Sequence, residues 1–129
     1  MSDKFIVEIV TPDSSILKTE VNEVTIPSYE GQMGILKDHI PLITFLRPGL
    51  ISIKGKEEKK YYVEEGTVEF LNDNLLILTS TAKELSSLDK NSLDNLLNKA
   101  EKQLRDDTTD KERYLLSYKI ETLKEISQY

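Results

Sequence analysis

Two hydrophobic periodicities divide the chain. In several short segments between residues 5 and 79, apolar and polar residues alternate with a period of two, which is typical of β-strands. From residue 89 onward, apolar residues recur every three or four positions, as on one face of an α-helix: Leu93, Leu96, Leu97, Ala100 and Leu104. The change of period near Ser87 predicts a β domain over residues 1–86 and a helical segment over residues 87–129.

The β segments are short, and turn residues separate them, which favours an antiparallel sandwich or barrel. Residues 75–78 are apolar at successive positions, so we expect residues 75–79 to form a central strand that is buried on both faces. The expected core consists of the apolar residues on one face of each strand: Phe5, Val7, Ile9, Val24, Ile26, Val68, Phe70 and residues 75–78.

Glycine and proline gather in residues 26–50, which hold three of the four prolines, three of the five glycines and the only histidine. Pro27 is expected to end the strand before it, because proline cannot donate a hydrogen bond to a neighbouring strand. The two glycines within residues 30–34 predict a loop of defined shape. Pro48 and Gly49 form a turn pair.

Residues 89–127 are predicted to form two helices with a break near residues 106–109. Asp89 suits the N-cap of the first helix, and Thr109 with Glu112 has the spacing of a capping box for the second. The second helix carries a narrow apolar stripe: Leu116, Ile120 and Leu123. Because each helix would be marginal alone, we expect an antiparallel hairpin that also needs the sheet or a partner. The predicted fold class is therefore α+β.

Composition excludes several classes of protein. The chain has 129 residues, a net charge of −6 and no cysteine. An acidic surface disfavours nucleic-acid binding, and the lack of cysteine excludes disulfides and thiolate chemistry. No apolar run approaches the roughly 20 residues of a spanning helix, and the N-terminus shows no signal peptide, so we expect a protein that stays in the cytosol or on its side of a membrane.

His39 is unique and therefore invites a catalytic or metal-binding interpretation. Asp38 adjoins it in sequence, but no serine or cysteine lies beside it in a nucleophile motif, and no second histidine can complete a common metal site. We expect a structural histidine at the edge of the sandwich, with no catalytic residue and no metal site. A small hydrolase or isomerase that uses His39 is the disfavoured alternative.

Four motifs occur in a fixed order within the first 50 residues. Residues 7–12 match V-x-I-V-(S/T)-P, residues 30–36 match E-G-x-x-G-(I/V)-L, residues 39–44 match an H-A-P-L-(L/I)-T-like stretch, and residues 46–49 match L-x-P-G. With the order of sandwich and hairpin, these motifs make the chain resemble the epsilon subunit of bacterial F-type ATP synthases.

The resemblance implies a non-catalytic rotor subunit of the central stalk, which couples ion translocation to ATP synthesis. Its sandwich would contact the γ subunit and the c-ring at the cytoplasmic face of the inner membrane, as a peripheral component. The implied contact residues are Glu30, Gly31, Gln32, Met33 and His39, with Gln32 standing where many members have an acid.

The resemblance also implies that the hairpin reaches the α and β subunits transiently and inhibits ATP hydrolysis. The basic residues implied to meet acidic residues of the β subunit are Lys111, Arg113 and Lys119. The default interpretation of these bases is a solvated helix face.

Some bacterial members bind ATP through an (I/L)-D-x-x-R-A motif where the first helix begins. In residues 88–93, Ser92 and Leu93 replace the arginine and the alanine of that motif. Serine cannot supply the forked cationic donors that suit phosphate, so we expect Asp89 only to cap the helix and no cofactor to bind. A stand-alone ATP-binding regulatory module is the alternative function.

Overall fold

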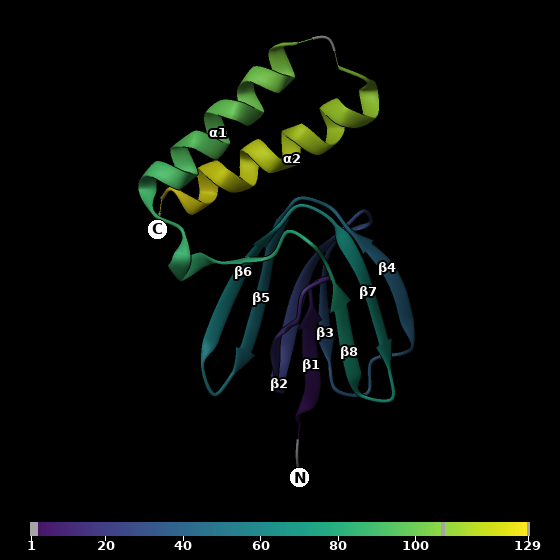
Figure 1. The fold of residues 1–129 in the computed structure, drawn as a ribbon. Helices are drawn as coiled ribbons and strands as arrows, with labels where there is room; N and C mark the ends of the chain where they lie inside the picture. Colours follow the sequence, from purple (N-terminus) through teal and green to yellow (C-terminus); the bar gives the residue numbers. More distant parts are fainter. Residues whose placement is uncertain (1–2, 107, 129) are drawn as a thin grey trace.

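The computed structural model describes residues 3–106 and 108–128, which form nine strands and two α-helices (Figure 1). The strands are β1 (Phe5–Val10), β2 (Ser15–Ser28), β3 (Gly31–Leu36), β4 (Leu42–Leu46), β5 (Gly49–Gly55), β6 (Glu58–Val63), β7 (Gly66–Leu71), β8 (Asn74–Leu78) and β9 (Lys83–Glu84). A 3₁₀ turn over Leu85–Ser87 leads to α1 (Lys90–Arg105) and α2 (Asp110–Ile126). The predicted order of β-sandwich and then two helices is confirmed.

Strand β2 belongs to both layers of the sandwich. Its first half pairs with β1, its second half pairs with β3 and β5, and a register shift between Val21 and Glu23 separates the two halves. Such an irregularity lets a strand bend from one sheet into the other. We call β1, β8, β7 and β4 the first sheet, and β3, the second half of β2, β5, β6 and β9 the second sheet.

One strand pair departs from the antiparallel arrangement. Among the described residues, β1 and β8 pair in parallel, and every other strand pair is antiparallel. The sequence pattern missed this pair because turn signals report only on strands that follow each other in the chain. A parallel pair needs a long connection, and here strands β2 to β7 supply it.

The core lies between the two sheets and contains the predicted residues except Leu76 and Leu78. Val7, Ile9, Val24, Ile26 and Ile77 have no exposed surface, and Phe5 packs edge-on against Phe70 with 5.6 Å between the ring centroids. Strand β8 is central in its sheet, between β1 and β7. It is buried on one face only, since Leu76 is half-buried and Leu78 is 44% exposed. The prediction of burial on both faces is therefore wrong.

The segment around Pro27 also differs from the prediction. Strand β2 continues through Pro27 to Ser28, and the backbone oxygen of Pro27 accepts a hydrogen bond from the Arg47 nitrogen at 3.0 Å. Gly49 lies so close that an added Cβ would meet the Pro27 Cβ at 2.5 Å. A glycine is thus needed here by a close approach of two segments rather than by turn geometry.

Residues 31–34 form a strand and not the predicted loop. The turn between β2 and β3 comprises only Tyr29 and Glu30. The Ser28 hydroxyl closes it, donating to the Gly31 oxygen at 2.7 Å and accepting from the Glu30 nitrogen at 3.2 Å. The glycines that suggested a loop instead permit a tight turn, because Gly31 has a φ of 117°.

Both predicted helix caps are present. The Asp89 carboxylate accepts a hydrogen bond from the Ser92 nitrogen at 2.7 Å, and the Thr109 hydroxyl accepts one from the Glu112 nitrogen at 3.1 Å. Asp107, within the predicted break, lies outside the described residues.

The helical hairpin lies across one end of the sandwich, and the N-terminus leaves from the opposite end (Figure 1). Leu123 and Ile126 of α2 are buried in a cluster with Tyr62 of β6, and this cluster is separate from the main core. Half-buried leucines pack around the cluster: Leu50, Leu85, Leu88, Leu93, Leu96 and Leu97. The hairpin therefore finds its apolar cover on the second sheet.

Candidate interaction surfaces

The outward side of the first sheet is unusually apolar. Ile43 is 76% exposed and Phe45 is 57% exposed, both on β4, and they share this side with Leu78 of β8. The alternate residues of the same strands point into the core. We call the outward residues Ile43, Phe45, Leu76, Leu78 and Val10 the outer apolar face.

The strand register arranges these residues in two rows across four strands. In one row, Phe45 lies opposite Thr67, Thr67 opposite Leu78, and Leu78 opposite Val10. A second row places Ile43 opposite Glu69, Glu69 opposite Leu76, and Leu76 opposite Glu8. Two carboxylates thus stand within a surface that is otherwise apolar except for Thr67. The Glu8 carboxylate also accepts a hydrogen bond from the Ser15 hydroxyl at 2.8 Å.

An open depression of about 600 Å³ adjoins this face at the end of the sandwich that lies nearer the helices. Its walls include Val10, Pro12, Phe45 and Leu78, with Tyr29 and Glu65 also among its lining residues. The depression is largely apolar and open, which suits a side chain from another protein better than a small polar substrate.

The hairpin contacts the end of the sandwich through aromatic side chains of α2. Tyr29 stacks on Tyr114 with 6.2 Å between ring centroids, and the Arg47 guanidinium carbon lies 3.9 Å from the centre of the Tyr118 ring. Tyr114 and Tyr118 also meet edge-on. A cation over an aromatic ring contributes about 0.5–1 kcal/mol at an exposed site.

An ion pair adds to this contact. Lys119 Nζ lies 3.0 Å from Glu64 Oε2, and the Tyr62 hydroxyl donates to the same oxygen at 3.0 Å. Burial raises the pKa of Tyr62 far above its ordinary value, and the charge of Glu64 raises it further. Tyr62 therefore remains a neutral hydrogen-bond donor, and Glu64 links the sandwich to α2.

The structure separates the residues predicted to contact the γ subunit and the c-ring. Glu30 and Gln32 are exposed near the hairpin, whereas half-buried Met33 packs against the core. His39 follows the other end of β3, where its ring meets Phe70 edge-on with 5.9 Å between centroids. Gly31 begins the strand and offers only backbone. These residues consequently lie at two ends of the sandwich and do not form one patch.

His39 has structural partners. Its Nδ1 lies 2.7 Å from the Ile40 oxygen, and the neighbouring Asp38 nitrogen donates to the Asp73 carboxylate at 2.8 Å. Among residues 3–106 and 108–128, no group of three or more histidine, cysteine, aspartate or glutamate side chains is placed to hold a metal ion.

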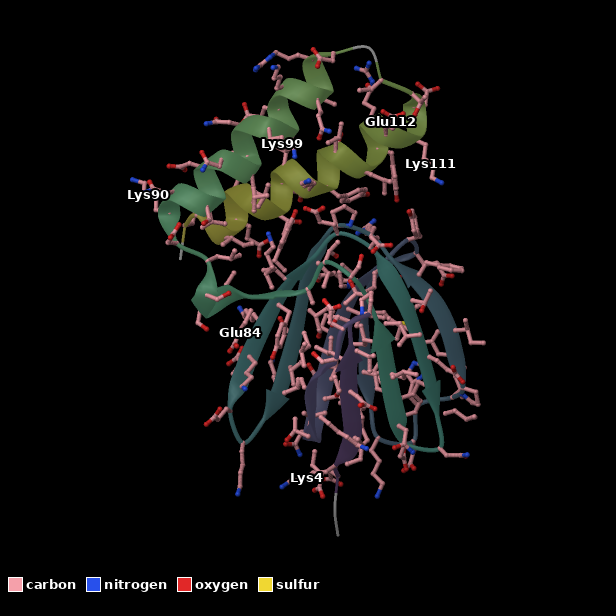
Figure 2. All side chains as sticks on the ribbon, viewed as in Figure 1. Lys4, Glu84, Lys90, Lys99, Lys111 and Glu112 are labelled. Carbon is pink, nitrogen blue, oxygen red and sulfur yellow. The ribbon has the colours of Figure 1, made fainter. Side chains whose placement is uncertain are left out.

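The three basic residues predicted to contact the β subunit lie in different surroundings. Lys111 and Arg113 are exposed near the start of α2, and Figure 2 shows Lys111 at the end of the hairpin where that helix begins. Lys119 instead faces the sandwich and pairs with Glu64. In this hairpin position, only Lys111 and Arg113 are open to another subunit.

The first turn of α1 shows what Asp89 does. Hydrogen bonds from Ser92 hold the pKa of Asp89 below its ordinary value, although the side chain is fully exposed. The carboxylate is therefore engaged as a helix cap. Ser92 at this position offers a hydroxyl where the nucleotide-binding motif has a guanidinium.

In the part of the chain that the structure describes, no helix combines the length and the apolar character needed to cross a bilayer.

The comparisons with known proteins agree with the sequence motifs. Residues 4–85 match the family described as ATP synthase, Delta/Epsilon chain, beta-sandwich domain. The ATP synthase epsilon chain of Pelagibacter ubique is 48% identical over 98% of this chain and 100% of its own length. That of Parvibaculum lavamentivorans is 31% identical over 98% of this chain and 97% of its own length.

This chain belongs to the ATP synthase epsilon chain family. The resemblance inferred from the four motifs is thereby confirmed. Members of this family are subunits of ATP synthase that carry no catalytic site of their own, so the chain is a non-catalytic part of that complex.

Two solved structures share the fold. A chain in the Euglena gracilis mitochondrial ATP synthase, described as OSCP/F1/c-ring, aligns with a TM-score of 0.78 and 22% identity over 99% of this chain and 82% of its own. A chain of the Tetrahymena thermophila mitochondrial ATP synthase, described as central stalk/c-ring, aligns with a TM-score of 0.68 and 14% identity over 95% and 93%. At these identities the likeness concerns the fold.

Sequence reasoning missed the outer apolar face and the aromatic contacts of the hairpin. A signal for the face was present, because all positions of β4 except Thr44 are apolar and only one side of a strand can face the core. The contact between Arg47 and Tyr118 joins residues that are far apart in the chain, and no local pattern reports it.

Proposed function

We propose that this chain is a rotor subunit in the central stalk of ATP synthase, where it helps couple ion translocation through the membrane sector to ATP synthesis. The observation that carries this proposal is the 48% identity to an ATP synthase epsilon chain over the full length of that protein. Proposed partners are the γ subunit and the c-ring, with transient contact to the α and β subunits. The chain would then be peripheral to the cytoplasmic face of the inner membrane through the complex.

The sandwich is suited to transmit torque. Its main core joins buried residues from both sheets, and β2 runs through both layers, so the two sheets cannot slide independently. Protein interiors of this kind are close-packed and resist deformation. A stiff body between rotating partners loses little of the applied torque to internal motion.

The ends of β3 offer two separate contacts. Gln32 is exposed near the hairpin, and exposed Ile40 marks the opposite end beside His39. We expect these ends to meet different parts of the assembly. Met33 is a poor site to test a contact because it packs against the core, so a charge there would also disturb the fold.

The hairpin is proposed to regulate hydrolysis by leaving its seat on the sandwich. Its contacts with the sandwich include a small apolar cluster, two aromatic contacts and one ion pair. A switch requires two arrangements that differ by only a few kcal/mol, and such a contact is compatible with that. Extended, the hairpin would present Lys111 and Arg113, together with the released Lys119, to acidic residues of the β subunit.

The test is a reconstitution experiment. ATP synthase of the same organism is prepared without this chain, and the purified chain is then added. Wild-type protein should restore ATP-driven ion pumping and co-purify with the γ subunit. If the β2–β3 turn contacts the c-ring, Gln32→Lys should restore ion pumping less well than wild type. Glu57→Lys, at the distant β5–β6 turn, should restore ion pumping as well as wild type. A wild-type chain that neither binds nor restores pumping would contradict the rotor assignment.

A further inference from the structure

We propose that the cleft between the helical hairpin and the end of the sandwich binds a small linear diamine, which carries an ammonium group at each end of a short hydrocarbon chain. The cleft has a volume of about 490 Å³, within the range of small-molecule sites. We call it the hairpin cleft. The lining residues that matter here come from the sandwich, from α2 and from the loop between the helices: Pro48, Glu65, Thr108, Glu112, Leu115 and Leu116.

The middle of the hairpin cleft is apolar. One face of α2 lines it with residues at positions i, i+3, i+4 and i+7: Glu112, Leu115, Leu116 and Lys119. The two leucines are half-buried, and buried Pro48 lines the cleft from the sandwich. The hydrocarbon part of a ligand therefore has an apolar floor to pack against.

Carboxylates flank this apolar floor. At one end, Glu112 belongs to the first turn of α2 (Figure 2). At the other end, Lys119 forms its ion pair with Glu64, whose neighbour in the chain is Glu65. Glu112 and Lys119 are seven positions apart on the helix, which corresponds to about 10 Å at a rise of about 1.5 Å per residue. A ligand with two cationic ends at comparable spacing meets an acid at each end.

Hydroxyl groups orient both of these carboxylates. Ser80 donates to Oε1 of Glu65 at 2.6 Å, and Thr109 donates to Oε1 of Glu112 at 3.1 Å. Both glutamates are exposed, so the second oxygen of each is accessible to a ligand. Acceptors that are already oriented lose less conformational freedom when a cation binds.

An independent observation also points to a ligand. The hydroxyl oxygen of Thr108 is buried and, in the part of the chain that the structure describes, has no hydrogen-bond partner. Buried polar atoms in folded proteins are nearly always hydrogen-bonded, because an unpaired one is costly. Thr108 lines the hairpin cleft beside the end that holds Glu112. An ammonium group at that end supplies the donor that Thr108 lacks.

The charges of the cleft select the kind of ligand. Its ionisable lining residues are four acids and one base: Glu64, Glu65, Asp106, Glu112 and Lys119. Because the base is paired with Glu64, phosphate and other anions find only acids around it. A compact metal ion does not fit either, since residues 3–106 and 108–128 place no three acidic, histidine or cysteine side chains to hold one. An organic cation with separated charges matches both the acids and the apolar floor.

The hairpin cleft exists only while the hairpin is docked, because the sandwich supplies Glu65 and the hairpin supplies Glu112. A ligand that binds one arrangement and not the other stabilises the arrangement it binds, increasingly as its concentration rises. The diamine would therefore hold the hairpin on the sandwich. This consequence for regulation rests on the proposed function, whereas the binding itself does not.

The experiment titrates the full chain with 1,5-diaminopentane in a calorimeter at low ionic strength. The test variant is Glu65→Gln with Glu112→Gln, in which each glutamine still accepts a hydrogen bond from its hydroxyl neighbour. The matched control is Glu57→Gln with Glu125→Gln, which removes the same charge from exposed residues of the sandwich and of α2 outside the cleft. Circular dichroism confirms the fold of each variant.

Two further comparisons separate the parts of the site. Thr108→Val removes the hydroxyl and keeps the shape of the side chain, so it tests the proposed contact with an ammonium group. Magnesium chloride serves as the second ligand, because Mg²⁺ carries the same charge as the diamine without its hydrocarbon chain. Hydrogen exchange in α2 with and without diaminopentane reports whether the ligand holds the hairpin in place.

We expect wild type to bind diaminopentane saturably, with a dissociation constant on the order of 1 mM, because exposed ion pairs are individually weak. The test variant should bind at least about tenfold more weakly, Thr108→Val a few-fold more weakly, and the control within about twofold of wild type. Mg²⁺ should bind more weakly than the diamine. Diaminopentane should slow exchange in α2 of wild type and leave the test variant unchanged.

The proposal is overturned if wild type shows no saturable binding, if the test variant binds as wild type does, or if Mg²⁺ binds as well as the diamine. Binding without slower exchange in α2 would overturn the link to the hairpin position. The rotor assignment is unaffected by each of these results, because it is tested by reconstitution with the complex and not with the isolated chain.

Discussion

The outward sides of the two sheets differ in kind although the sheets share one core. On the second sheet, the outward rows across β2, β5 and β6 are polar: Thr25, Ser52 and Lys60 form one, and Glu23, Lys54 and Glu58 form another, which exposed Leu36 extends on β3. Lys54 and Glu23 are 3.9 Å apart there, as solvated surface charges often are. On the first sheet, the equivalent rows hold Phe45 with Leu78 and Ile43 with Leu76.

The difference teaches where cover is expected. The polar rows are solvated by water. Tyr62 and Leu50, at the end of the second sheet, pack against the hairpin. The outer apolar face has neither. Alternation of polar and apolar residues therefore distinguishes a face that meets water from a face that we expect to meet protein, within one domain.

The largest expected effect comes from placing a charge on the outer apolar face. Phe45→Glu should weaken binding to ATP synthase lacking this chain by about 100-fold or more, because a central aromatic anchor is lost and a carboxylate joins Glu69. Leu36→Glu is the matched control, since Leu36 is 54% exposed on β3 of the second sheet, close to the 57% of Phe45. Equal losses for both would erase the distinction between the faces.

Removing the hairpin should make the second sheet resemble the first. A chain ending at Ser87 should fold, because the main core is separate from the Tyr62 cluster. Exposing Tyr62 and half-buried Leu50 should lower the free energy of unfolding by roughly 2 kcal/mol, and should increase binding of a hydrophobic dye. Chemical denaturation of both chains measures this. Retained binding to the complex together with faster ATP hydrolysis would support inhibition by the hairpin, and unchanged hydrolysis would count against it.

The polar contact under the hairpin should have a smaller effect. Lys119→Gln removes the cation from Glu64 and should destabilise the docked hairpin by about 1 kcal/mol, visible as faster hydrogen exchange in α2. Lys111→Gln is the control on the same helix, because Lys111 is exposed. If the two variants exchange at the same rate, the ion pair does not hold the hairpin in place.

The smallest effect concerns the cap of α1. Because hydrogen bonding lowers the pKa of Asp89 in the folded state, its contribution to stability is complete above the ordinary value of 3.8 and is lost as the pH falls below it, toward the folded-state pKa. Asp89→Asn keeps a capping group that does not titrate. The helical circular dichroism signal of this variant should therefore change less with pH in that acidic range than the signal of wild type. Circular dichroism between pH 5 and pH 2 would show identical curves if the cap does not contribute.

Much of the fold followed from local pattern. Period-two alternation located the strands, and the caps at Asp89 and Thr109 located both helices within one residue of their starts. The reason is that caps and alternation are short-range physics. The segment at residues 31–34 was mistaken for a loop because glycine serves both loops and the tight turn that begins β3.

What the sequence did not predict depends on contacts between distant residues. Gln32 and His39 are far apart because β3 is a strand that separates them. Lys119 faces the sandwich, unlike Lys111, because Glu64 lies next to α2 and forms an ion pair with Lys119. For residues 75–78, apolar character on both sides predicted burial on both faces, but within this chain only one face is buried. Whether the other face is covered depends on packing between distant segments, which the local pattern does not report.

The parallel pairing of β1 with β8 has a consequence for synthesis. The first strand to leave the ribosome pairs on one side with β2, which follows at once, and on the other with residues 74–78. The sheet therefore stays open along one edge of β1 until most of the sandwich has emerged, and pairing over such a separation is slow because a long loop must close first. Only β9, the 3₁₀ turn and the hairpin remain to be made when that edge closes. The closing strand β8 also carries Leu76 and Leu78, so two of the five residues of the outer apolar face take their places in the same step that ends the exposure of the edge.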